Sequence, residues 1–130
     1  MLNTDNGVIH LPSNHSVDDT MQRLVDLLHT KGITLFAVVD HSSEAEKVGL
    51  KMPPTRLAIF GNPRGGTPVM LAAPTSALDL PLKILVSEDE KGAVRLSFNS
   101  AEFLQHRHGI PAEFHGLLAG VGDLAAAAGA

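Results

Sequence analysis

Polar residues of the types that bind ligands or transfer protons follow directly after apolar runs in this sequence. Six of them are candidates for one site: Asp40, His41, Asn62, Arg64, Asp79 and Lys83. Ligands of α/β proteins bind where the ends of strands meet the starts of helices. The pattern therefore predicts a cleft with Asn62 and Arg64 on one wall and His41, Asp79 and Lys83 facing them, close to Asp40.

These candidates permit more than one chemistry. The cations Arg64 and Lys83 favour a small anionic ligand, whereas His41 and Asp79 favour a divalent metal, and the sequence decides neither. We predict binding of a small ligand or metal ion without established catalysis, and the sequence does not identify a cofactor. One alternative is an acid–base enzyme that acts on a small anionic substrate through Asp40, His41 and Lys83, because a general acid needs only placement and a shifted pKa. Another is a dimeric protein-interaction module.

The segment FGNPRGGTPVM (residues 60–70) is a candidate anion-binding loop because glycines precede an expected helix. Gly61 and Gly66 have the spacing of a phosphate-binding P-loop, but Thr67 stands where that motif needs its lysine. Backbone N–H groups together with Arg64 suit a generic anion site. The alternative is a simple turn from strand to helix, with Thr67 as the cap and Pro68 in the first helical position.

The sequence contains seven histidines, so a metal site is a possibility to test. Their spacing, however, places no two neighbouring histidines where they could bind one metal ion. Asp40 and His41 point to opposite faces if both lie in a strand. His106 and His108 lie about 200° apart around a helix axis. A metal site would therefore need residues distant in sequence, for example His41 with His108 and a carboxylate. Otherwise these histidines are surface residues.

Composition excludes several partners. The net charge of -4, the lack of a long Lys/Arg run and the absence of Tyr and Trp argue against nucleic-acid binding. No apolar run approaches the ~20 residues of a membrane helix. The chain has no cysteine, which excludes thiol catalysis and disulfides, and its start does not resemble a signal peptide. We expect a cytoplasmic protein.

Periodicity predicts a single domain, residues 1–130, with the element order β-α-β-α-β-α-β-β-α-α. Ser16 is the expected cap of the first helix, and Ser100 that of a later one. The alternation of LPLKILVSED and AVRLSFNS around EDEKG predicts a hairpin. The result is an α/β (α+β) sandwich of two layers with about five strands. In its core we expect Phe60 and Phe98, packed against Leu24, Leu28 and Val38.

Several stretches together resemble domain-of-unknown-function family 302. They are GITLFAVVDHSSEAEKVGLKMPPTRLAIFGNP, FGNPRGGTPVM, APTSALDLPLKILVSEDEKGAVRLSFNS and FLQHRHGI, which cover about residues 16–110. The resemblance implies a compact two-layer α/β fold with a mixed sheet, often a homodimer, and no established activity. An open sheet also leaves edges that need cover, so we expect a homodimer. Residues 111–130 are expected to form a C-terminal helix whose tail, LAAAAGA, frays.

Overall fold

The computed structural model describes residues 6–130 and contains the expected order of strands and helices. Two short 3-10 helices, Pro74–Leu78 and Ala112–Phe114, precede β4 and α5. The other elements are β1 (Val8–Pro12), α1 (Val17–Thr30), β2 (Thr34–Asp40), α2 (His41–Lys47), β3 (Thr55–Gly61), α3 (Pro63–Ala72), β4 (Leu82–Glu88), β5 (Val94–Asn99), α4 (Ala101–His108) and α5 (His115–Gly129).

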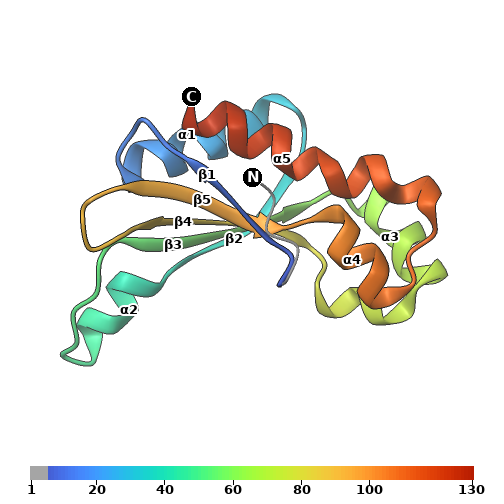
Figure 1. Ribbon diagram of the computed structural model, residues 1–130, viewed down its shortest axis with the longest axis horizontal. Helices are drawn as coiled ribbons and strands as arrows, with labels where there is room; N and C mark the ends of the chain where they lie inside the picture. Colours follow the sequence, from blue (N-terminus) through green and yellow to red (C-terminus); the bar gives the residue numbers. More distant parts are fainter. Residues whose placement is uncertain (1–5) are drawn as a thin grey trace.

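The five strands form one open sheet in the order β1-β5-β4-β3-β2. Helices α1 and α5 lie on one face of this sheet, α2 projects at one end, and α3 and α4 lie at the other end (Figure 1). The predicted two-layer α/β sandwich with five strands is confirmed. Every pairing in the sheet is antiparallel, however, so the expected mixed sheet is wrong in this detail. Strands β2 to β5 follow one another as neighbours in alternating directions, whereas α1 carries the chain from β1 at one edge of the sheet to β2 at the other.

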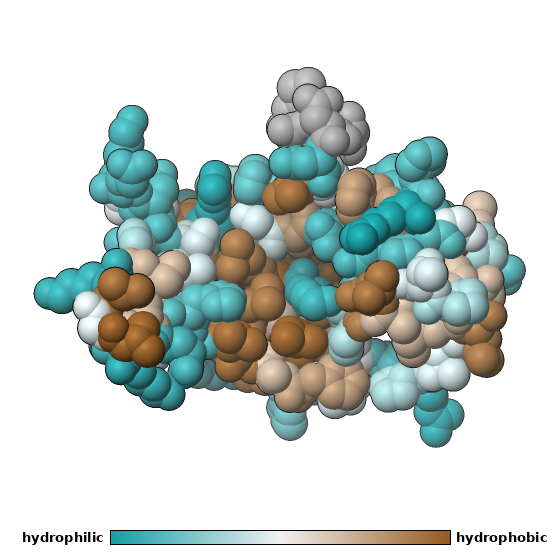
Figure 2. All heavy atoms as spheres, turned by 90° about the horizontal axis from the view of Figure 1, so that it is seen from below, coloured by the Kyte–Doolittle hydropathy of each residue, from teal (hydrophilic) through white to brown (hydrophobic). Residues whose placement is uncertain are grey.

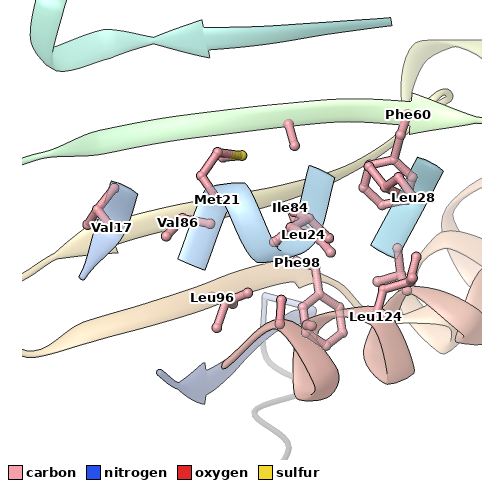
Figure 3. Packing of buried hydrophobic residues seen from close by; sticks show 14 residues of the cluster. Val17, Met21, Leu24, Leu28, Phe60, Ile84, Val86, Leu96, Phe98 and Leu124 are labelled. Carbon is pink, nitrogen blue, oxygen red and sulfur yellow. The ribbon is translucent and has the colours of Figure 1, made fainter. Parts of the chain in front are cut away.

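The core lies between the sheet and helices α1 and α5. Phe60 is 1% exposed and Phe98 is 8% exposed, and Leu24 and Leu28 of α1 are fully buried beside them (Figure 3). These four core positions are as predicted. Val38 is 40% exposed, so its predicted place in the core is wrong. It lies on β2, the edge strand of the sheet, where neighbouring elements pack on fewer sides.

Polar caps begin two of the helices where the sequence predicts them. The Ser16 hydroxyl accepts a hydrogen bond from the Asp19 N–H of α1 at 3.0 Å. The Ser100 hydroxyl likewise accepts from the Phe103 N–H of α4. These caps satisfy N–H groups that a helix leaves without partners at its start. Among residues 6–130, none of the helices combines the length and the apolar character that crossing a bilayer demands.

The C-terminal segment is part of the core, so the predicted frayed tail is wrong. Helix α5 continues to Gly129, and Ala125 and Ala128 are fully buried. The Arg23 guanidinium donates to the Ala128 carbonyl at 2.9 Å, which ties the last turn to α1. A side chain at Gly129 would place its Cβ 2.8 Å from the Pro12 carbonyl oxygen. The small residues therefore permit α5 to approach the sheet closely.

Candidate functional site

The segment FGNPRGG is a strand end followed directly by the first turn of α3. The Asn62 side chain caps this helix by accepting from the Arg64 N–H at 3.0 Å, and Pro63 occupies the first turn. The N–H groups of Gly65 and Gly66 donate to the Asn62 carbonyl at 3.0 and 2.8 Å. The first-turn N–H groups thus already have acceptors. The arrangement is that of a strand-to-helix turn.

The expected start of this helix at Thr67 is wrong. Helix α3 begins at Pro63, so Pro68 lies inside it and Thr67 faces a pocket instead of capping. Asn62 supplies the cap earlier in the chain, and Pro63 has a φ angle suited to a helix. The glycine pair did not stop the helix, because tertiary contacts outweigh its weak helix propensity.

The two adjacent glycines have different neighbours. A Cβ on Gly65 would lie 2.6 Å from the Leu117 side chain, so Gly65 lets the beginning of α5 approach α3. A Cβ on Gly66 would meet no atom within 4 Å, because Gly66 faces the open space of the pocket. Gly65 therefore serves packing, and Gly66 leaves the pocket open.

The pocket beside this helix has a volume of about 170 Å³ and a predominantly apolar lining. A register shift in β2 between Leu35 and Ala37 marks a bulge at Phe36. The Phe36 ring lies 3.7 Å from the place where a Gly61 Cβ would be, so it forms one wall. Bulges commonly redirect a side chain in this way. The lining residues are Phe36, Gly61, Asn62, Pro63, Gly66, Thr67, Met70, Leu80, Pro81, Leu82 and Leu117.

Only one of the six predicted site residues, Asn62, lines this pocket. The Lys83 ammonium donates to the main-chain carbonyls of Asp79 and Pro81 at 3.1 and 2.8 Å. Burial of Lys83 lowers its pKa, and the Asp79 carboxylate opposes this effect. Arg64 is exposed, and within the described chain neither Arg64 nor Lys83 lines the pocket. Neither of the two predicted cations therefore contributes a charge to the lining of this pocket.

Asp40 and His41 lie at the opposite end of the sheet, so the predicted shared cleft is wrong. Asp40, the last residue of β2, pairs with Arg56 near the start of β3, whereas Gly61 ends β3 beside the pocket. Seven strand residues separate these two ends by about 20 Å. Strands β2 and β3 are antiparallel, and the end of one therefore meets the start of the other.

Asp40 caps helix α2 and also pairs with a cation. Its carboxylate accepts from the Ser43 N–H at 3.0 Å and the Ser42 hydroxyl at 2.8 Å, and it lies 3.2 Å from Arg56 Nε. The Ser43 N–H bond, and then the Ser42 bond, lower the pKa of Asp40 from 3.8 to about 2. The role of Asp40 in the structure is thus to hold α2.

We expect the Asp40 cap to make stability depend on pH in a narrow acidic range. The folded pKa lies below the unfolded value, so the ionised cap stabilises the fold above pH ~4 and this contribution is lost as the pH falls toward ~2. Carboxyl NMR titration should give a midpoint near 2 for Asp40. The variant Asp40→Asn keeps a cap acceptor and should show a weaker dependence in this range. A midpoint near 3.8 would contradict the expected cap.

A second polar cluster joins the 3-10 helix Pro74–Leu78 to α4. The side chain of His108 is only 3% exposed; its Nε2 lies 2.5 Å from Asp79 Oδ2 and its Nδ1 lies 2.9 Å from the Thr75 hydroxyl. Arg107 also contacts the Asp79 carboxylate, at 3.1 Å. The sequence indicated Asp79 and His108 but not Thr75 or Arg107, because only tertiary folding brings these four together.

The predicted metal pair of His41 and His108 is wrong. His41 begins α2 at one end of the sheet, and His108 ends α4 at the other (Figure 1). Over residues 6–130, no three His, Cys, Asp or Glu side chains are placed to hold one metal ion. The cluster around His108 therefore fits a tertiary hydrogen-bond network that fastens α4.

The family model "Domain of unknown function DUF302" matches residues 9–126. The chain belongs to the DUF302 family. The match extends beyond the residues that carry the resemblance in the sequence, and it includes most of α5. A crystal structure of an uncharacterised conserved DUF302 protein from Bacillus stearothermophilus has the same fold, with a TM-score of 0.77 and 16% identity. That similarity covers 95% of this chain and 96% of the other.

Curated relatives of this DUF302 protein are considerably longer. It is 41% identical over 106 residues, 82% of its length, to Fluoride-specific ion channel FluC 1 of Brucella suis, and covers 42% of that protein. The same identity and coverage of this chain hold for FluC 1 of Brucella abortus and FluC 2 of Brucella melitensis, of which it covers 39%. The chain thus spans about two fifths of the length of the curated relatives it matches.

Proposed function

We propose that this DUF302 domain binds a small ligand, and that a compact apolar group of the ligand occupies the pocket beside α3. The observation that carries the proposal is the apolar pocket of about 170 Å³. An engineered apolar cavity of ~150 Å³ binds benzene, so this volume suits one aromatic ring or a branched alkyl group. Asn62 and Thr67 at the lining supply a small number of polar groups, as in other ligand pockets.

The surroundings of the pocket favour this apolar ligand over the anion or divalent metal suggested by the sequence. The first N–H groups of α3 donate to Asn62, and the Lys83 ammonium donates to two carbonyls. An anion would have to compete with these existing bonds. Asp40 and His41 lie about 20 Å away, at the far end of β3, so an acid–base enzyme built on them and Lys83 has no shared site. Binding without turnover is the function we favour.

The relatives named fluoride-specific ion channels support an accessory role for this domain. The chain corresponds to about two fifths of their length, so in those proteins a similar domain shares a chain with a further region. Fluoride binding would need free hydrogen-bond donors, and the apolar pocket is poorly suited to it. We therefore propose that the domain senses or retains an apolar ligand and does not itself hold the ion. A cytoplasmic location belongs to the same proposal, and the cysteine-free sequence suits it.

A thermal-shift screen with a pocket-filling variant tests the ligand proposal. The probes are indole, phenol and toluene, compared with phosphate, acetate, fluoride, Mg²⁺ and Zn²⁺. We expect an aromatic probe to raise the Tm of the wild type by mass action. Gly66→Leu should remove the shift, because its side chain enters the pocket, while Leu suits a helix better than Gly. Gly120→Leu is the control, since Gly120 also faces open space but lies outside the pocket lining.

Two outcomes would contradict the apolar ligand. One is a flat response to all aromatic probes, and the other is an equal shift in the Gly66→Leu variant. A shift caused by phosphate or acetate, and abolished by Lys83→Ala, would instead support the anion site that the sequence suggested.

A further inference from the structure

Helix α3 turns one face toward the pocket, and Thr67 lies on that face. The pocket is at the end of the sheet where α3 follows β3 and the start of α5 lies beside α3 (Figure 1). The α3 residues in its lining are Pro63, Gly66, Thr67 and Met70, a spacing that puts them on one side of a helix. Asn62 supplies the helix cap, so the Thr67 hydroxyl is not required for it. This hydroxyl is therefore available to a ligand.

The rest of the lining provides apolar surface and no charge. Leu80 and Pro81 precede β4, and Leu117 belongs to α5. Asn62 is the other polar residue, and its side-chain oxygen already accepts from the Arg64 N–H at 3.0 Å. Within the described chain, no charged side chain contributes to the lining. The pocket thus combines an apolar lining with one uncommitted hydroxyl.

The size of the pocket suits a single ring with one small substituent. Its volume is about 170 Å³. An engineered cavity of ~150 Å³ binds benzene, so roughly 20 Å³ remains for a group the size of a hydroxyl. The rings of Phe36, Pro63 and Pro81 present flat surfaces to such a ligand, and the Met70 thioether is of the kind that contacts aromatic rings favourably. An aromatic ring is the shape that these side chains fit best.

We propose that the ligand is a single neutral aromatic ring that carries one hydroxyl group, and that this group binds the Thr67 hydroxyl. The inference rests on the ligand proposal above and specifies its chemistry. A threonine hydroxyl both donates and accepts hydrogen bonds, and so does a phenolic hydroxyl. A ligand without a polar group displaces water from the Thr67 hydroxyl and gives it no partner, which costs free energy. Thr67 is therefore the residue that determines specificity.

The charges around the pocket favour a hydroxyl over a carboxylate on the same ring. The Lys83 ammonium donates to the main-chain carbonyls of Asp79 and Pro81, and Arg64 is exposed outside the lining. A carboxylate in the pocket would lose its hydration without gaining a cation. A neutral hydroxyl loses less, because one hydrogen bond to Thr67 replaces its bond to water.

A hydrogen bond to one named residue also identifies the place of binding. On β3, Ala58 and Phe60 are buried on the helix side, so Leu57 and Ile59 point to the opposite face. Viewed from that side, hydrophobic residues gather over the middle of the molecule (Figure 2). An apolar probe can adsorb to this surface as well as enter the pocket. Loss of binding on removal of the Thr67 hydroxyl reports on the pocket alone.

Isothermal titration calorimetry of the full chain with phenol and with toluene tests the contact. In Thr67→Val, a methyl group replaces the hydroxyl and the branch at Cβ is kept. We expect the variant to bind phenol about tenfold more weakly, since a net hydrogen bond is worth roughly this factor. Its dissociation constant for toluene should stay within about twofold of the wild-type value. Comparing each ligand between the two proteins cancels the different ease with which phenol and toluene leave water.

Three controls make the result specific. Thr67→Ser keeps a hydroxyl and should retain phenol binding. Thr30→Val makes the same change at an exposed helical residue outside the lining, so both dissociation constants should match those of the wild type. Benzoate, which carries a carboxylate on the same ring, should bind the wild type at least about tenfold more weakly than phenol.

The outcomes separate this inference from the ligand proposal on which it rests. If phenol binding is unchanged in Thr67→Val, or falls by the same factor as toluene binding, the contact with Thr67 is refuted. Benzoate that binds more tightly than phenol would refute the neutral ligand. Gly66→Leu should abolish binding of both phenol and toluene, because it fills the pocket itself. If neither compound binds the wild type, the ligand proposal fails and this inference fails with it.

Discussion

Phe60→Ala should lower the free energy of unfolding by about 3–5 kcal/mol. The Phe60 ring is 1% exposed and lies on β3 between the sheet and α1, with Leu24 and Leu28 in the same core cluster. Removing it leaves a cavity lined by side chains from rigid elements, which can collapse only in part. Urea unfolding should show a lower midpoint with an unchanged m value, because the variant exposes the same surface when it unfolds.

Phe36→Ala is the matched control for this core prediction. The same atoms are removed, but the Phe36 ring is 51% exposed at the edge strand. We expect a cost of about 1 kcal/mol or less, since less than half of that ring is shielded from water. Equal costs for the two phenylalanines would show that the helix-facing side of β3 has been assigned wrongly.

The fold could be predicted because its local signals agree with one another. Ser16 and Ser100 are caps that need only a nearby N–H group, and alternation on β4 and β5 shows which residues face the core. Phe98 of β5 follows from that alternation, and Phe60 follows from its place in the apolar run of β3. The exposure of Val38 could not be predicted in this way, because the alternation within a strand does not show whether that strand lies at the centre or the edge of the sheet.

The candidate site was less predictable because it depends on how the strands pair. Asp40 ends β2 and Asn62 follows β3, and in a parallel sheet these two strand ends would have met at one edge. In this antiparallel sheet they are separated by the length of β3. The pocket itself depends on the Phe36 bulge and on Leu117 from a distant helix, and neither produces a local sequence pattern.

The C-terminal segment shows how composition alone can mislead. LAAAAGA contains few large side chains, which suggested little burial and a frayed end. In the structure the small residues let α5 pack directly against the sheet. The approach is so close that Gly129 has no room for a Cβ. Ala is also the strongest helix former. Low hydrophobic bulk therefore reflects close packing here.

Ala125→Asp should consequently destabilise the protein by about 3 kcal/mol or more, because it buries a carboxyl group in an apolar site without a partner. Ala125 is fully buried in the core cluster, whereas the adjacent Ala126 is exposed to solvent. Ala126→Asp places the same charge at almost the same distance from the end of α5, so any unfavourable effect of the helix dipole is nearly equal. We expect that control to cost no more than about 1 kcal/mol. Thermal and urea unfolding of the two variants measure the difference. If the tail were frayed, the two variants would lose the same free energy of unfolding. If α5 is packed, the loss for Ala125→Asp should be several times the loss for Ala126→Asp.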